Sequence, residues 1–209
     1  MKFLVVCCEG QTEEVFVEQI LSPHFHKIGV FVTSNNMKGI SSYKKMEEHI
    51  KGFCLANPTA FVTTMVDYYG LKKDVPGLAV AVGDIYQKSE SIEIAVNADM
   101  HRLDNLHFNL IVHEFEGLLF SDVSAFEGIA NKSELAQLRN EKGNQTPEHI
   151  NGAYATAPSR RILKVLPKYI KTIDGIEVAK RIGLEKMAQE CLHFGQWLKK
   201  IEDWAKGVA

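Results

Sequence analysis

The feature that most constrains the fold is the short apolar run at residues 3–8, which stops at Glu9 and Gly10. A continuous run of this length is typical of a strand covered on both faces, as in the parallel sheets of α/β proteins. The acids Glu13 and Glu14 follow, where the apolar spacing changes to that of a helix. A carboxylate at the end of a buried strand either caps the next helix or holds a metal ion.

Strand-like and helix-like segments alternate along the first 120 residues. Three further strands are predicted, at residues 29–33, 60–66 and 108–112. Helices are predicted between the strands, at residues 12–25 with Thr12 as N-cap, 41–55 and 84–100. This order predicts an α/β fold with a mainly parallel, four-stranded sheet sandwiched by helices.

The remainder of the chain has the pattern of helices alone. They are predicted at residues 123–138, 161–166, 177–182 and 184–201. We therefore expect an α/β core at residues 1–122 and a helical C-terminal extension, residues 123–209, packed on it. The polar, turn-rich segment at residues 140–161 is long for a connection inside a compact domain, and such loops are often functional.

The amino-acid composition excludes few classes of protein. The 209 residues carry a net charge of −2, which neither indicates nor excludes a nucleic-acid-binding protein. The four cysteines lack zinc-site spacing and are expected as buried, small apolar residues, with adjacent Cys7 and Cys8 facing opposite ways. There is no P-loop sequence, and no apolar run approaches the roughly 20 residues of a membrane span. With no signal-peptide pattern, we expect a cytoplasmic protein that does not bind membranes.

Acidic residues stand where three of the predicted strands end. Glu9 follows the first strand, Asp67 the third, and Glu114 and Glu116 the fourth. Because ligands of parallel sheets sit beyond the carboxyl ends of the strands, we expect these side chains to converge. Clustered carboxylates favour Mg²⁺ or Mn²⁺, and such a site activates water or clamps a phosphodiester. The alternative is that these acids cap helices or face solvent.

Histidine and tyrosine residues lie next to these acids. His113 precedes Glu114 and is either a general base, a ligand or a strand-end histidine with a structural contact. Tyr68 and Tyr69 follow Asp67 and either stack on a base or pack beneath a loop.

One basic cluster occurs in the chain. It comprises Arg160, Arg161, Lys164, Lys168 and Lys171. These residues are candidates to hold the phosphates of a substrate, with a solvated helix face as the alternative.

Long motifs in the chain resemble a bacterial domain-of-unknown-function family with a TOPRIM-like core. They are "CEGQTEEVFV", "VTTMVDYYGL" and "HEFEGLLFSD" at the strand ends, then "PEHIN", "TAPSRRI", "IGLEKM" and "CLHFGQWL". TOPRIM domains occur in topoisomerases, primases and nucleases of the overcoming-lysogenisation-defect type. The resemblance covers nearly the whole chain and implies a TOPRIM-like fold.

The resemblance also implies a site and a function. TOPRIM domains bind Mg²⁺ through a glutamate after the first strand and an Asp-x-Asp after the third, so Glu9 and Asp67 take these positions. The second aspartate position holds Tyr69, and Glu116, or else Glu114, supplies the missing oxygen ligand. The implied function is that of a metal-dependent nuclease in phage defence, working with a separate ATPase of the ABC/SMC type. The alternative is a non-catalytic subunit of an ATPase complex with a degenerate acidic site.

Overall fold

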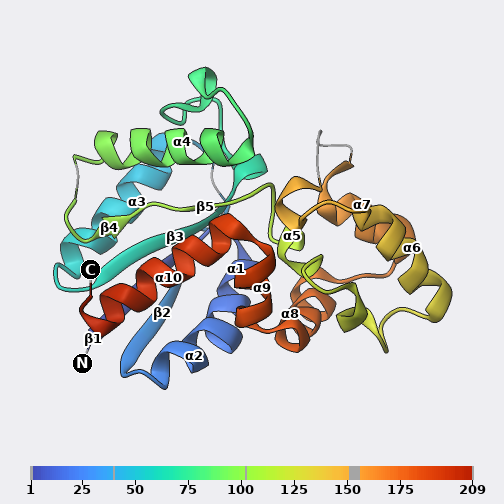
Figure 1. Ribbon diagram of the computed structural model, residues 1–209. Coiled ribbons are helices and arrows are strands. Elements are labelled where there is room, and N and C mark those ends of the chain that lie inside the picture. The colour runs from blue at the N-terminus through green and yellow to red at the C-terminus, as the bar shows by residue number, and fades with distance from the viewer. Residues whose placement is uncertain (1, 40, 102, 151–155, 209) are drawn as a thin grey trace.

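A parallel β-sheet forms the centre of the computed structural model, which describes residues 2–39, 41–101, 103–150 and 156–208 (Figure 1). The strands are β1 (Lys2–Cys8), β2 (Val30–Asn36), β3 (Phe61–Asp67), β4 (Leu106–His107) and β5 (Leu110–Ile111). Their order is β2-β1-β3-β4, with β5 beside the end of β3, and every pairing is parallel. The predicted α/β fold with a mainly parallel sheet is confirmed.

The fourth predicted strand is interrupted, so β4 and β5 pair separately with β3. The side chain of Thr64 takes the place of the backbone ladder there. Its hydroxyl donates to the carbonyl of Asn109 at 2.7 Å and accepts from the Asn109 N–H at 2.8 Å. The buried polar groups of the gap are thereby satisfied.

The first helix begins after Gly10 and not at Thr12, as we expected from the sequence. It comprises α1 (Gln11–Phe16), a π-helical turn (Val17–Leu21) and α2 (Ser22–His26). Gly10 is the N-cap, and the Glu13 carboxylate accepts a hydrogen bond from its N–H at 3.0 Å. Glycine has no side chain with which to cap a helix, so the acid three residues later satisfies this donor.

Helices cover both faces of the sheet (Figure 1). On one face, α3 (Tyr43–Ala56) and α4 (Ile85–Asp99) pack against a core that includes Val5 and Cys7. On the other face, Leu4, Val6 and Cys8 join a larger core with the N-terminal and C-terminal helices. The two adjacent cysteines therefore face opposite ways, and all four cysteines are buried and free, as predicted.

The helices after the sheet are α5 (Glu116–Leu119), α6 (Lys132–Lys142), α7 (Pro158–Val165), α8 (Ile176–Ile182), α9 (Leu184–Glu190) and α10 (Leu192–Lys206). Short 3₁₀ turns lie at Tyr68–Gly70, Leu78–Val80, Val123–Phe126 and Pro147–His149, and a second π-helical turn at Lys171–Gly175. The predicted helix at residues 123–138 is thus a 3₁₀ turn followed by α6. In the turn-rich segment predicted to be functional, residues 151–155 lie outside the described residues.

The predicted helix at residues 184–201 is divided at Cys191, where the backbone is extended. The buried Glu148 explains the division, because its carboxylate accepts hydrogen bonds from the N–H groups of His193 and Phe194 at 3.0 and 3.1 Å. These donors would otherwise be unsatisfied at the start of α10. From there α10 returns along the sheet, and its Trp204 carbonyl accepts a hydrogen bond from the Lys2 ammonium near the other end of the chain.

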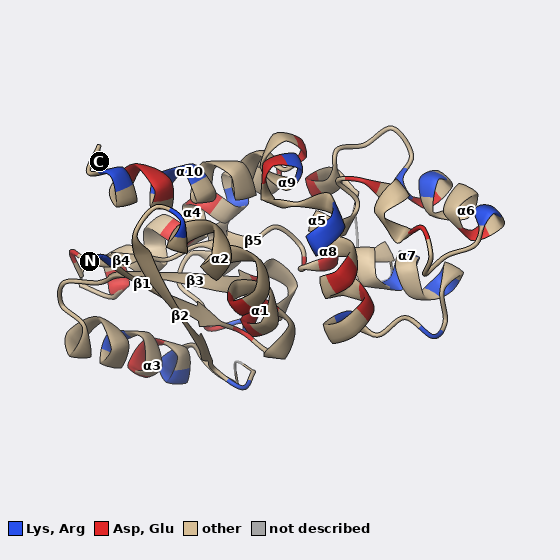
Figure 2. Cartoon of the chain, turned by 90° about the horizontal axis from the view of Figure 1, so that it is seen from below, with Lys and Arg blue, Asp and Glu red and all other residues tan. Residues whose placement is uncertain are grey.

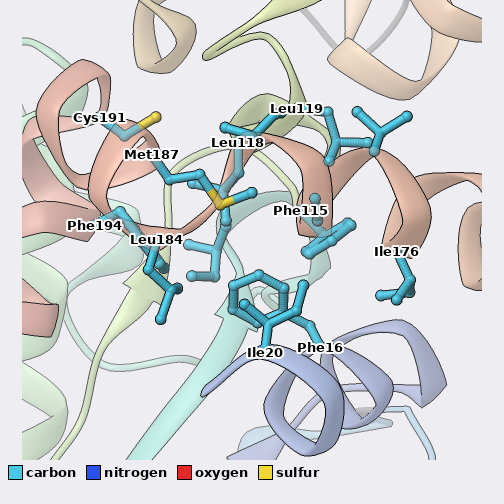
Figure 3. Close-up of a cluster of buried hydrophobic side chains, with 14 of the residues drawn as sticks. Phe16, Ile20, Phe115, Leu118, Leu119, Ile176, Leu184, Met187, Cys191 and Phe194 are labelled. Atoms are coloured by element: carbon cyan, nitrogen blue, oxygen red, sulfur yellow. The ribbon is translucent and has the colours of Figure 1, made fainter. Parts of the chain in front are cut away.

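Aromatic side chains tie the first helix to the later ones (Figure 3). Phe16 of α1 lies edge-to-face with Phe115 at a centroid distance of 5.5 Å and with Phe194 of α10 at 6.2 Å. All three are fully or almost fully buried. This packing fixes α1 and the segment around Glu116 relative to each other. Among the described residues, no helix is long and apolar enough to cross a membrane.

Candidate active site at the strand ends

Glu9 and Asp67 meet at the ends of adjacent strands β1 and β3. The Glu9 carboxylate accepts a hydrogen bond from the backbone N–H of Asp67 at 3.0 Å. It lies directly against Gly70, where an added β-carbon would come within 2.3 Å of Glu9 Oε2. The third residue after Asp67 must therefore be glycine for Glu9 to occupy this position.

Asp67 joins the sheet to the segment that carries Glu116. Its Oδ1 accepts a hydrogen bond from the backbone N–H of Phe115 at 3.0 Å. Its Oδ2 lies 3.8 Å from the ammonium of Lys171. The predicted convergence of the strand-end acids is therefore seen for Glu9, Asp67 and Glu116.

Lys171 stands at the centre of these acids. Its Nζ lies 3.1 Å from Glu116 Oε2 and 3.9 Å from Glu13 Oε1, besides its contact with Asp67. Lys171 is the first residue of the π-helical turn Lys171–Gly175. We refer to Glu9, Glu13, Asp67, Glu116 and Lys171 as the acidic cluster.

The acidic cluster has four carboxylates and one lysine, and its pKa shifts reflect this imbalance. Burial, with the neighbouring acids, raises the pKa values of Glu9 and Asp67. Burial raises the pKa of Glu116 to about 7, although Lys171 acts in the opposite direction. The pKa of Lys171 is itself raised, because the attraction of three carboxylates outweighs its burial. The cluster is therefore short of positive charge.

The donor atoms suit a hard divalent cation, but their arrangement does not form a ready metal site. Glu13 Oε1 is a buried carboxylate oxygen with no hydrogen-bond partner, and Glu116 Oε2 is a buried one whose contact is Lys171. Carboxylate oxygens are what Mg²⁺ and Mn²⁺ prefer. Within the described residues, however, no three His, Cys, Asp or Glu side chains are placed to share one metal ion. The position at which the carboxylates converge is taken by the ammonium of Lys171.

Two other acids near the cluster have structural partners. Glu114 accepts a hydrogen bond from the backbone N–H of Ser159 in the first turn of α7, as a helix-capping acid does. Glu14 accepts one from the Asn36 side chain at 2.8 Å, at the end of β2. Of the two strand-end acids at residues 114 and 116, Glu116 is the one that contacts Lys171.

His113 and Tyr69 stack on each other, with ring centroids 5.3 Å apart and planes at 20°. The Tyr69 N–H also donates to the His113 carbonyl at 3.0 Å. Burial lowers the pKa of His113 to about 4, so its ring is neutral at pH 7. Tyr68 lies edge-to-face with Tyr69 and packs on the core beneath α3 and α4. Tyr69, which stands where a second aspartate was expected, thus forms a stacked pair with His113.

The basic residues predicted to hold phosphates lie on α7 and just beyond it. Arg161 and Lys164 both pair with Glu141 of α6, at 3.8 and 2.6 Å. Acidic and basic residues are interspersed along α6 (Figure 2). Lys168 lines a separate cavity of about 590 Å³ with Tyr169 and Asp174. Lys171, the last residue of the predicted basic cluster, reaches the strand-end acids Asp67 and Glu116.

Sequence reasoning missed three members of this site. Glu13 has two functions, because one oxygen caps α1 while the other faces Lys171. The position of Glu13, four residues after Glu9, could have indicated this role. The first turn of a helix that follows a strand lies at the edge of the sheet where that strand ends. For Gly70 the sequence indication was weaker: it is a glycine three residues after the predicted site residue Asp67. Nothing in the sequence indicated that Lys171, from the far end of the chain, enters the cluster.

One family model, described as a domain of unknown function (DUF4276), matches residues 8–202. This match spans every residue of the acidic cluster. No curated protein and no solved structure matches the chain. The resemblance to TOPRIM domains therefore stays a prediction.

Proposed function

We propose that this chain, which belongs to the DUF4276 family, carries out phosphoryl transfer on nucleic acid, as a nuclease that depends on Mg²⁺ or Mn²⁺. The observation that carries the proposal is the acidic cluster, in which four carboxylates and one lysine gather at the strand ends. Glu9 follows β1, while the other acids belong to α1, β3 and α5 and contact Lys171. Two buried acids, Glu13 and Glu116, with two partly buried ones beside them raise the free energy of the folded state, so their presence together favours a functional role. In parallel sheets this edge is where ligands bind.

The excess of negative charge supports a cation as the missing component. A phosphodiester is itself an anion, so it cannot approach these carboxylates unless their charge is compensated. When bound by carboxylates of this kind, a divalent cation neutralises the phosphate and makes bound water more acidic. The oxygens available for it belong to Glu9, Glu13, Asp67 and Glu116.

The chain's own contacts hold these oxygens in place. The Asp67 N–H and the backbone of Gly70 orient Glu9, and the Phe115 N–H orients Asp67. Glu13 is fixed by its bond to the Gly10 N–H. Such preorganised ligands are what a reactive centre needs, because catalysis is sensitive to small misplacements.

The test is cleavage of DNA and RNA, including tRNA, by the purified chain in the presence of Mn²⁺, alone and with an ATPase encoded beside it. We expect Glu9→Gln and Glu116→Gln to abolish cleavage. Glu14→Gln is the matched control, because Glu14 belongs to the same run of acids but bonds to Asn36. Cleavage that survives in both cluster variants, or none in the unaltered chain under either condition, would refute the proposal.

A second function, a non-catalytic subunit of an ATPase complex, is favoured by one observation. The ammonium of Lys171 already pairs with three of the four carboxylates, and Tyr69 stands where TOPRIM domains have a second aspartate. In that case the cluster would be a structural ion-pair network. Titration calorimetry distinguishes the two, since a purely structural cluster binds neither Mg²⁺ nor Mn²⁺ at millimolar concentration, with or without Lys171.

A further inference from the structure

Lys171 is the most solvent-exposed partner in its contacts with the acids of the cluster. The three carboxylates that it contacts have side chains only 1%, 4% and 14% exposed, whereas the Lys171 side chain is 36% exposed. The acids are therefore fixed in the interior, and the cation between them has a path to solvent. A flexible four-carbon stem allows the ammonium to leave without a change in the backbone.

The segment that carries Lys171 is itself well anchored. The Asp174 carboxylate accepts a hydrogen bond from the Ile170 N–H at 2.7 Å, which closes the turn around Lys171. The Ile170 carbonyl in turn accepts from the N–H of Asp174 at 2.8 Å. Single π-helical turns of this kind are frequent at functional sites. The turn thus holds the base of the lysine while its tip remains movable.

Lys171 satisfies the acids only partly. Two of its three contacts, those with Asp67 and Glu13, are 3.8 and 3.9 Å long, and the buried Glu13 Oε1 has no hydrogen-bond partner. A divalent ion of Mg²⁺ or Mn²⁺ size has twice the charge of an ammonium and binds carboxylate oxygens at about 2.0–2.2 Å. The oxygens around Lys171 are thus of the type that a divalent ion prefers, and they would have to move closer together to bind one.

We propose, on the basis of the function proposed above, that Lys171 is a tethered cation that occupies the divalent-metal position and is displaced when the metal binds. In the absence of metal, the metal position is therefore filled by the chain's own lysine. Metal and Lys171 exclude each other, because a second positive charge a few ångströms away in a buried site is strongly repelled. Lys171 in this account is a competitor of the metal and not one of its ligands.

Titration calorimetry with Mn²⁺ tests this inference. We expect Lys171→Met, which keeps the length of the side chain but removes the charge, to bind Mn²⁺ about tenfold or more tightly than the unaltered chain. Adding Glu116→Gln to that variant should remove the gain. Lys186→Met is the matched control, because Lys186 forms an ion pair with Glu190 on α9 and should leave the affinity unchanged. Equal or weaker binding by Lys171→Met, or no binding by either protein, would overturn the inference.

A second measurement applies if Lys171→Met does not fold, since its acids would then lack a partner. Lysine acylation of the unaltered chain, mapped by mass spectrometry, reports where the ammonium of Lys171 lies. Saturating Mg²⁺ should raise the acylation rate of Lys171 several-fold relative to that of Lys186. An unchanged ratio would show that the metal does not displace the lysine.

The outcomes separate this inference from the proposed nuclease function. A gain in Mn²⁺ affinity without cleavage of any nucleic acid would support the displacement of Lys171 and refute the nuclease. Cleavage that depends on Glu9 and Glu116 but no gain in affinity would support the nuclease and overturn the displacement.

Discussion

At the scale of single residues, the candidate site depends on a few positions that have no freedom to vary. Gly70 lies against the Glu9 carboxylate, and the Asp67 N–H donates a hydrogen bond to the same carboxylate. Glu13 divides its two oxygens between the Gly10 N–H and the cluster. Each of these contacts fixes the orientation of one acid in the cluster.

Replacing Gly70 with alanine should displace Glu9, because the added β-carbon would overlap its carboxylate oxygens at 2.3 and 2.4 Å. A misplacement of this size in a reactive centre costs on the order of a hundredfold in rate. We expect Gly70→Ala to lose Mn²⁺-dependent cleavage to this extent, as measured by initial rates. Gly52→Ala serves as the control, because no atom lies within 4 Å of the β-carbon it would add on α3. Full activity in Gly70→Ala would show that the position of Glu9 is not important.

The strand-end acids were predictable because they obey a local rule, whereas Lys171 was not. Glu9, Asp67 and Glu116 each follow a strand, and parallel strands bring their ends together. Lys171 reaches them only because α8, α9 and α10 pack back onto α1 through long-range apolar contacts. Such packing has no local sequence signature. Lys171 was therefore predicted to act with its basic neighbours as a phosphate-binding residue.

At the scale of helices and strands, most elements follow from apolar periodicity, and the deviations have identifiable causes. The helix predicted at residues 184–201 breaks at Cys191, because Glu148 satisfies the first N–H groups of α10. The fourth strand divides where Thr64 bonds to Asn109. In both cases a side chain distant in sequence replaces a backbone partner, which no local pattern reveals.

The contact between α4 and α10 predicts a pH dependence of stability. His193 Nε2 lies 3.1 Å from Glu93 Oε1. Burial by itself lowers the pKa of His193, but the hydrogen bond to Glu93 and the negative charges of Glu93, Glu148 and Glu90 together outweigh it, so the pKa is raised. A histidine whose pKa is higher in the folded state stabilises the fold below its unfolded pKa of about 6.5, and this contribution is lost as the pH rises through the folded value.

Glu93→Gln should reduce this dependence, because it removes the hydrogen-bonded carboxylate beside His193. We expect the unfolding free energy of the unaltered chain to exceed that of the variant by on the order of 1 kcal/mol at a pH of about 5.5, and by less at about 8.5. Urea unfolding at the two pH values gives the comparison. A difference that grows with pH would contradict the assigned direction of the shift.

At the scale of the whole molecule, one core holds the site together. Phe16 contacts both Phe115 and Phe194, so it joins the first helix, the segment before α5 and the last helix. The residues predicted as an α/β core and those predicted as a helical extension contribute to the same apolar cluster. The acids of the cluster are positioned by this shared packing.

Phe16→Ala should therefore destabilise the chain by about 3–5 kcal/mol, the usual cost of a large cavity in a core. Ile94→Ala on α4 is the control, because Ile94 is 62% exposed and its loss should change stability by less than about 0.5 kcal/mol. Urea unfolding followed by circular dichroism measures both. Equal losses in the two variants would mean that Phe16 is not central to the core.

The most direct test of the central claim, that the acidic cluster is a divalent-cation site, is anomalous diffraction from crystals soaked in saturating MnCl₂. We predict a manganese peak between the carboxylates of Glu13, Asp67 and Glu116, with the Lys171 side chain turned away from it. Crystals with the ammonium of Lys171 still among these carboxylates and no manganese there would contradict the claim.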